Sequence, residues 1–188
     1  MRTSLTSTAV ALSAAALTVG LTAGLAGTAN AERYGVDDSR DTFHGSDIRD
    51  VSVVNGPKNV HVTSTHDNLV PDFKSGSGGR IYLDTDRDDW GPEYVLVGGF
   101  YSGTDYQLLE TDGFASANWG EPVEGSYQMT LDFTAEQVHL RVSQEALGGA
   151  DEVRVAMRVS GQRTDGSSHG LVDWLGDRRV MTPWVAQG

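Results

Sequence analysis

The sequence contains no cysteine, and this absence excludes disulfide bridges, thiolate metal sites, a cysteine nucleophile and a lipid anchor attached through cysteine. A domain without these devices must be held by a packed core, with or without a bound ion. The chain is long enough for one such core, since a domain of about 150 residues buries about 70% of its unfolded surface. We therefore expect a single domain over residues 46–188.

Basic residues are scarce, because 14 Lys and Arg stand against 26 Asp and Glu, for a net charge of −12. Nucleic-acid backbones and anionic membranes repel such a protein. We therefore expect no nucleic-acid partner, and no membrane partner once the N-terminal segment is removed. The charge is compatible with cations, with an extracellular polysaccharide and with a basic protein.

The longest uncharged stretch lies at the N-terminus. A weakly basic start precedes residues 9–28, which are rich in Ala, Gly, Leu and Thr, and Ala29-Asn30-Ala31 follows. This three-part pattern is typical of a signal peptide. The alternative is an uncleaved anchor, but the stretch partitions weakly into hydrocarbon and no basic cluster follows it. We predict a signal peptide over residues 1–31, a secreted, extracellular chain that starts at Glu32, and a polar N-terminal arm over residues 32–45.

Apolar and polar residues alternate through most of the remaining chain, which favours antiparallel sheets with one buried and one wet face. The alternating or short apolar segments are Val51–Val62 (a hairpin with its loop at Asn55–Asn59), Ile81–Leu83, Tyr94–Phe100, Tyr106–Leu109, Tyr127–Phe133, Val138–Val142 and Val153–Val159. Ser143 can cap one helical turn through Leu147, which Gly148-Gly149 ends. The predicted fold is all-β: an antiparallel two-sheet β-sandwich, jelly-roll-like, with one short helical turn.

The most specific chemical pattern is the acidic segment from Asp84 to Glu93, Asp-Thr-Asp-Arg-Asp-Asp-Trp-Gly-Pro-Glu. Carboxylates at alternate positions of a tight loop offer the oxygen ligands that Ca²⁺ prefers. The first three aspartates have the spacing of an EF-hand calcium loop. The match then fails, because Asp89 stands where that loop has its turn glycine and Val95 stands where it has its final glutamate. We predict a Ca²⁺ site formed by Asp84, Asp86, Asp88 and Glu93, with no other cofactor. The alternative is a solvated acidic loop between two strands.

Two tryptophans, Trp90 and Trp119, lie in glycine-rich, acidic segments that we expect to be loops. An indole ring packs on the face of a sugar while neighbouring carboxylates accept its hydroxyl protons. We therefore predict Trp90 and Trp119 as ligand-binding residues for polysaccharide. The alternative is that both rings only pack against the domain, as we expect for Trp184.

Four segments together carry a family resemblance: the hairpin Val51–Val62, the run Ile81–Asp86 followed by Gly91 and Tyr94, the run Val142–Gly148 before Val153–Val159, and Asp173-Trp174. In their order they resemble carbohydrate-binding-module family 9 and DOMON-like β-sandwich domains, together with related bacterial secreted domains. The resemblance implies a two-sheet β-sandwich. Members of this broad group bind sugars, haem or metal ions, and no Met and His pair here matches haem ligands.

Catalytic patterns are weak. Gly166-Ser167-Ser168-His169-Gly170 matches the G-x-S-x-G nucleophile motif, but a polar loop precedes it and no amphipathic helix follows. The five histidines show no H-E-x-x-H spacing. We therefore predict no enzyme, but a secreted, non-catalytic binding or accessory protein. The alternatives are an inhibitor or envelope-associated factor whose acidic surface meets a basic partner, and a small hydrolase.

Overall fold

The structure is a computed structural model that describes residues 32–40, 46–75, 77–161 and 171–188. The predicted signal peptide, residues 41–45 of the predicted arm and the Gly166–Gly170 motif lie outside these residues. Among the described residues, no helix has the length and hydrophobicity needed to cross a bilayer.

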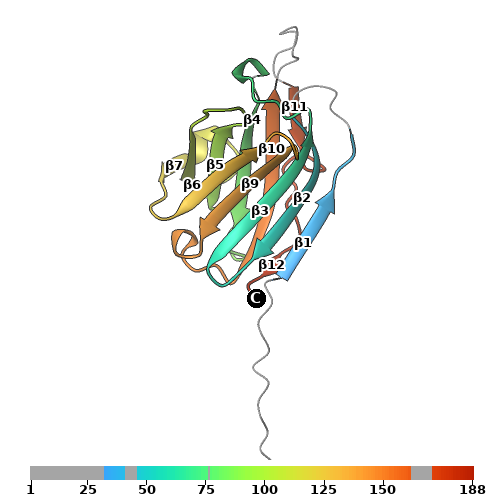
Figure 1. Cartoon of the computed structure of the whole chain (residues 1–188). Coiled ribbons are helices and arrows are strands. Elements are labelled where there is room, and N and C mark those ends of the chain that lie inside the picture. The colour runs from blue at the N-terminus through green and yellow to red at the C-terminus, as the bar shows by residue number, and fades with distance from the viewer. Residues whose placement is uncertain (1–31, 41–45, 76, 162–170) are drawn as a thin grey trace, which may run out of the picture.

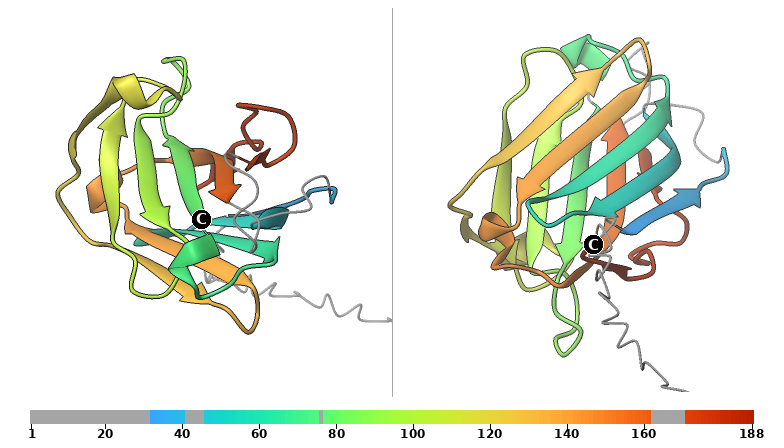
Figure 2. Two further views of the ribbon diagram at one scale, coloured as in Figure 1. Left: turned by 90° about the horizontal axis from the view of Figure 1, so that it is seen from above. Right: turned by 60° about the horizontal axis from the view of Figure 1, so that its bottom comes forward.

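The described chain folds as a sandwich of two antiparallel sheets, which confirms the predicted all-β fold (Figures 1 and 2). Sheet A has the strand order β1 (Glu32–Asp37), β2 (Asp47–Asn55), β3 (Asn59–Asp67), β9 (Gln137–Ser143) and β8 (Tyr127–Asp132). Sheet B has the order β11 (Leu171–Trp174), β10 (Glu152–Gly161), β4 (Gly78–Asp84), β5 (Tyr94–Gly99), β6 (Tyr106–Thr111) and β7 (Trp119–Pro122). The short strand β12 (Val185–Ala186) pairs with the beginning of β10. In Figure 1 the strands of sheet A cross in front of those of sheet B.

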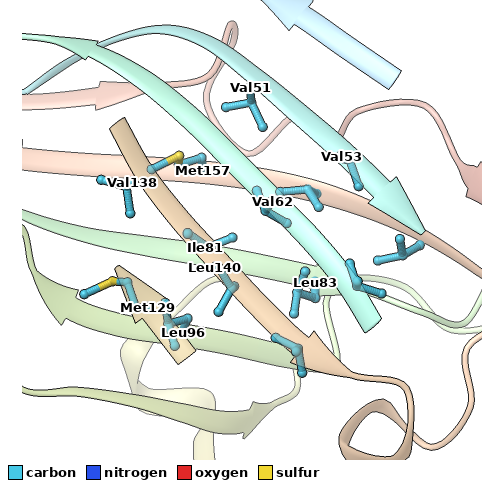
Figure 3. Close-up of a cluster of buried hydrophobic side chains, with 14 of the residues drawn as sticks. Val51, Val53, Val62, Ile81, Leu83, Leu96, Met129, Val138, Leu140 and Met157 are labelled. Atoms are coloured by element: carbon cyan, nitrogen blue, oxygen red, sulfur yellow. The ribbon is translucent and has the colours of Figure 1, made fainter. Parts of the chain in front are cut away.

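The core lies between the two sheets, and the predicted alternation supplies it (Figure 3). Each strand turns every second side chain inward, so the branched aliphatic residues of facing strands interdigitate. Sheet A contributes Val51, Val53, Val60, Val62, Met129, Val138, Leu140 and Val142, and sheet B contributes Ile81, Leu83, Leu96, Leu108, Val153, Val155, Met157 and Val159. Burying each such side chain stabilises the fold by about 1.5–3 kcal/mol, which explains how a chain without disulfides holds together.

Short edge elements are where the structure departs from the expected pattern. Glu32–Asp37, expected within a polar arm, form β1 and pair with β2 along their whole length. Most of their side chains are exposed, because an edge strand can be held by backbone hydrogen bonds alone. The strands β7, β11 and β12 are also too short to show a period.

The predicted helical turn is present as a 3₁₀ turn over Glu145–Leu147, and Ser143 Oγ accepts the Ala146 amide proton at 3.2 Å. Gly148 and Gly149 follow with φ values of 70° and 80°, the left-handed conformation that ends such a turn. Two further 3₁₀ turns span Phe73–Ser75 and Ser116–Asn118.

A polar cluster is buried around His66, which is 1% exposed. Its Nε2 lies 2.8 Å from Ser64 Oγ, and its Nδ1 lies 3.4 Å from the carbonyl oxygen of Ser46. A carbonyl only accepts, so Nδ1 carries the proton and Nε2 accepts from the serine hydroxyl. Burial lowers the pKa of His66 to about 4, although the bond to Ser46 opposes this shift. Because Ser64 is fully buried as well, this Ser–His pair contributes to structure and has no access to solvent.

Candidate functional site on the outer face of sheet B

The outer face of sheet B carries a second apolar layer, on the side that faces away from the core. Tyr82 stands between Ile81 and Leu83, which face the core, so its ring points outward. Tyr82, Val95 and Ala156 are fully buried in this layer. The residues packed on them are Val97, Leu109, Phe114, Trp119, Trp174 and Met181.

Three aromatic rings fix one part of this layer. Tyr82 stacks on Trp174 with a centroid separation of 6.2 Å and an interplanar angle of 9°. Phe114 meets Tyr82 and Trp174 edge-on, at 5.0 and 6.0 Å. The Tyr82 hydroxyl donates to the Phe114 carbonyl oxygen at 3.0 Å, which attaches the loop before β7 to the sheet. The layer is therefore a rigid support for the surface beside it.

Beside this layer lies an open cleft of about 630 Å³, which we call the Trp119 cleft. It is lined by Val97, Gly98, Gly99, Asp105, Tyr106, Gln107, Leu109, Trp119 and Tyr127. The outward side chains of β5 and β6 line one part, and Tyr106 and Tyr127 meet edge-to-face at 6.3 Å where the sandwich opens between β6 and β8. Its volume is in the range of small-ligand sites, and its aromatic lining with a few polar groups is typical of them.

Two local features keep the cleft open. Strand β7 pairs with β6 only at Leu109 and Thr111, so the beginning of β6 has no neighbouring strand on that side. Gly98 lies opposite Tyr106, and a Cβ atom on this glycine would be 2.8 Å from the Tyr106 Cβ. Only glycine allows this close approach of β5 to Tyr106, so Gly98 fixes the position of the Tyr106 ring at the cleft.

A smaller cleft of about 240 Å³ shares Tyr106 with the first. Its lining residues are Tyr101, Ser102, Gly103, Thr104, Tyr106, Met129, Leu131 and Phe133. The two clefts thus follow one edge of the sandwich, where β6 of sheet B faces β8 of sheet A. An extended ligand can contact both through Tyr106.

Trp119, one of the two predicted ligand-binding residues, lines the larger cleft. It was expected in a loop but is the first residue of β7 and pairs with Thr111. Its half-buried ring packs on the outer apolar layer, and the Arg80 guanidinium carbon lies 4.8 Å from the ring centroid. Its indole Nε1 is buried and has no hydrogen-bond partner among the described residues. The ligand-binding role itself stays a prediction.

Trp90, the other predicted ligand-binding residue, lies in the loop between β4 and β5 and is 83% exposed. It is not a lining residue of the Trp119 cleft, so the structure does not bring the two tryptophans into one site. Asp86, Asp88 and Asp89 of the same loop are also exposed. The tip of this loop therefore combines a free indole ring with carboxylates.

The four predicted calcium ligands occupy different environments, beginning with Asp84, which is fully buried. Its Oδ2 accepts two hydrogen bonds from Arg154, from Nε at 2.7 Å and from Nη2 at 2.6 Å. Its Oδ1 is buried without a hydrogen-bond partner in the described chain. Burial raises the pKa of the Asp84 carboxyl, and the bond from Arg154 offsets part of this rise.

Glu93 Oε2 accepts from the Thr85 amide at 2.6 Å and from the Thr85 hydroxyl at 3.1 Å. Burial raises the Glu93 pKa, and the charge of Asp84 adds to the rise. The Asp86 Oδ1 accepts the amide proton of Asp88 at 2.8 Å, a local turn on the exposed part of the loop. In the part of the chain that the structure describes, no three acidic or histidine side chains converge as metal ligands. The Ca²⁺ site stays a prediction.

Trp184 lies at the base of the acidic loop, between two arginines. The guanidinium carbons of Arg87 and Arg154 are 4.8 and 4.5 Å from its ring centroid. Arg87 also forms an ion pair with Glu152 of β10. Trp184 thus packs the loop against β10 and the C-terminal segment, in keeping with the structural role expected for it.

The outer face of sheet A carries a different feature, a pair of stacked histidines. The rings of His61 and His139 lie 5.3 Å apart, with His61 Nδ1 3.2 Å from His139 Nε2. Burial lowers the pKa of both, and the charge of Arg141 contributes to each shift. Two rings are too few for a metal site, so this pair does not compete with the Trp119 cleft as a candidate site.

Sequence reasoning missed most residues of the cleft, including Tyr106, Gln107 and Tyr127, as well as Arg80 beside it. Tyr106 and Tyr127 begin two of the predicted strands, and this position at strand ends was their only signal. No protein-family model matches the sequence, and comparison with curated proteins gives no match. These comparisons leave the resemblance to carbohydrate-binding-module family 9 and DOMON-like domains as an expectation, and the geometry of the outer face carries the functional argument.

Proposed function

We propose that the protein is a secreted, non-catalytic carbohydrate-binding module whose binding site is the Trp119 cleft. The observation that carries the proposal is the composition of this cleft. Three aromatic side chains, a carboxylate and a carboxamide line about 630 Å³ of open space on a rigid sheet. Apolar rings with a few well-placed polar groups suit a sugar, which has an apolar ring face and polar hydroxyls at its rim.

Each lining group has a role in this proposal. The Trp119 ring supplies a flat apolar surface for the face of a pyranose. The Gln107 carboxamide and the Asp105 carboxylate, both exposed, accept hydrogen bonds from hydroxyl groups, and the carboxamide also donates. Because the outward side chains of β5 and β6 are set by the sheet, little ordering entropy is lost on binding.

The ligand in this proposal is a polymer. The smaller cleft continues from Tyr106 to Phe133 along the edge of the sandwich, which suits a second sugar unit. Contacts from several weakly bound units then add up along the chain.

The test is affinity electrophoresis of the purified protein in gels that contain single soluble polysaccharides. Trp119→Ala removes the stacking surface and should weaken binding about tenfold or more. Because this change also uncovers the apolar layer, Gln107→Ala serves as a second variant at an exposed position and should weaken binding severalfold. Trp90→Ala is the matched control and should bind like the parent protein. Absence of retardation by every glycan, or equal retardation of all variants, refutes the proposal.

Secretion is part of the proposal and is supported by the signal-peptide pattern of residues 1–31. Protein recovered from the culture medium should have the intact mass of a chain that starts at Glu32. Recovery of the uncleaved chain in the membrane fraction contradicts this.

A structural Ca²⁺ in the acidic loop is the second addition to the proposal. It is supported by the buried Asp84 Oδ1, which has no hydrogen-bond partner in the described chain. Burial raises the pKa values of Asp84 and Glu93, the charges of neighbouring aspartates add to each rise, and a cation there would relieve this added repulsion. Ca²⁺ at a hundredfold excess over its dissociation constant should stabilise the protein by about 2.7 kcal/mol, and Mg²⁺ should do less. Identical melting in millimolar Ca²⁺ and in chelator rules the site out.

The exposed loop tip favours one alternative function, interaction with a basic protein. Trp90 is 83% exposed, and exposed carboxylates flank it. Such a complex would be lost in Trp90→Ala and weakened by salt, while Trp119→Ala would leave it intact.

A further inference from the structure

Two arginines lie side by side on the outer face of sheet B, beside the Trp119 cleft, and a third lies near them. Arg80 of β4 and Arg158 of β10 are directly opposite in the register of the two strands. Side chains at such positions start about 5 Å apart and point to the same face. Arg178, in the segment between β11 and β12, lies near enough for its charge to act on Arg158.

These arginines have no acidic partner, a property they share with Arg33, Arg141 and Arg179 of the described chain but not with the ion-paired arginines. Arg154, Arg87 and Arg49 all form ion pairs with Asp or Glu. Among the described residues, Arg80, Arg158 and Arg178 have no carboxylate within 4.0 Å. In a protein with 26 acidic residues and 14 basic ones, this local excess of positive charge is unexpected by composition.

The arrangement costs folding free energy, since like charges directly opposite on a sheet repel. Burial lowers the pKa of Arg158, and the charges of Arg80 and Arg178 lower it further. The contact between the Arg80 guanidinium and the Trp119 ring offsets part of this repulsion, and a bound anion would offset it further.

The cluster is continuous with the cleft. Val97, which lines the cleft, is the register partner of Arg80, and Arg158 follows one strand further along the same row. The Arg80 guanidinium also lies over the Trp119 ring, 4.8 Å from its centroid. A sugar in the cleft therefore meets positive charge on its β4 side, while Asp105 and Gln107 of the lining come from the region of β6.

We propose that the Trp119 cleft selects acidic polysaccharides, and that Arg80 and Arg158 bind the carboxylate of a uronic acid unit. This inference rests on the proposed carbohydrate-binding function. A guanidinium presents two parallel N–H donors that match the two oxygens of a carboxylate, and two facing guanidinium groups neutralise their repulsion by sharing one anion. Arg178 adds a third positive charge at the rim of this site.

The test compares polygalacturonate with its methyl ester, a matched polymer in which the carboxylates are masked, at 150 mM salt. The parent protein should bind polygalacturonate at least tenfold more tightly than the ester. Arg80→Gln and Arg158→Gln should each lose most of this preference. Arg33→Gln, which removes the same charge from β1 on the opposite sheet, should retain it. Neutral dextran and dextran sulfate complete the panel.

Stability separates ligand binding from a structural role. If the arginines serve the ligand, Arg158→Gln relieves repulsion, so its melting temperature should equal or exceed that of the parent protein. Lower melting temperatures for both Arg variants, with the carboxylate preference unchanged, overturn the inference. Equal binding of the acid and the ester, or binding of dextran sulfate alone, also overturns it, while retention of any neutral glycan leaves the carbohydrate-binding proposal standing. If no glycan of the panel binds, both proposals fail.

Discussion

His66 should make the stability of the protein depend steeply on pH between about 4 and 6.5. The ring is 1% exposed, and burial keeps it neutral and lowers its pKa to about 4 in the folded state, although the hydrogen bond to Ser46 opposes this shift. In the unfolded chain its pKa returns to about 6.5. Between these values the unfolded state binds the proton and the folded state does not, so stability falls as the pH is lowered.

The magnitude follows from the two pKa values. A difference of about 2.5 units corresponds to about 3 kcal/mol, of which about 2 kcal/mol is already lost at pH 5. Below pH 4 the loss is complete, and above pH 7 the histidine contributes no pH dependence. Since typical domains are stable by only 5–15 kcal/mol, a loss of this size is readily measured.

The perturbation is His66→Gln, which removes the titrating ring but keeps a polar side chain. Urea unfolding from pH 4 to 7.5 should give the variant a lower stability at pH 7.5 and a flatter pH profile, with about 3 kcal/mol less loss at pH 4. His139→Gln is the control, because its ring is only half-buried and should flatten the profile less. Parallel profiles for the parent protein and His66→Gln would refute a neutral His66 in the core.

Three further predictions concern packing, the acidic loop and its buried ion pair. Gly79→Ala should destabilise the protein by about 1–3 kcal/mol in urea unfolding, because the new Cβ would lie 2.0 Å from the buried Phe100 ring; a change below 0.5 kcal/mol would contradict this. Gly35→Ala is the control, because a Cβ atom added there would have no atom of a non-adjacent residue within 4 Å. It should change stability by less than about 0.5 kcal/mol. Asp84→Asn should cost about 3 kcal/mol, since it breaks a buried ion pair, whereas Asp86→Asn at the exposed tip should be nearly neutral; equal effects would show that the pair contributes little.

The sheets were predictable from sequence because a buried face imposes a period of two on every long strand. Val153–Val159 illustrates this, since each of its alternate valines reaches the core. The same rule cannot predict the strand Glu32–Asp37, because its pairing with β2 buries almost no side chain. Exposed edge strands are held by backbone hydrogen bonds, which leave little trace in the sequence.

The site was less predictable, for two physical reasons. Trp119 stands out in the sequence because an aromatic ring close to carboxylates suits a sugar, whereas Arg80 and Arg158 each resemble an ordinary polar residue on the wet face of a strand. Their proximity comes from the pairing of β4 with β10, which are far apart in sequence. In the acidic loop, the alternate spacing of the aspartates is visible in the sequence. The ion pair between Asp84 and Arg154 is not, because it joins residues that are far apart in sequence.

The central claim is that the Trp119 cleft is where a sugar binds, and amide chemical shifts during titration with an oligosaccharide test it most directly. The proposal predicts shifts that cluster at Val97, Gln107 and the Trp119 indole N–H, on the outer face of sheet B. Residues around His61, on the outer face of sheet A, should not respond. Shifts confined to the loop around Trp90, or none at saturating sugar, would contradict the claim.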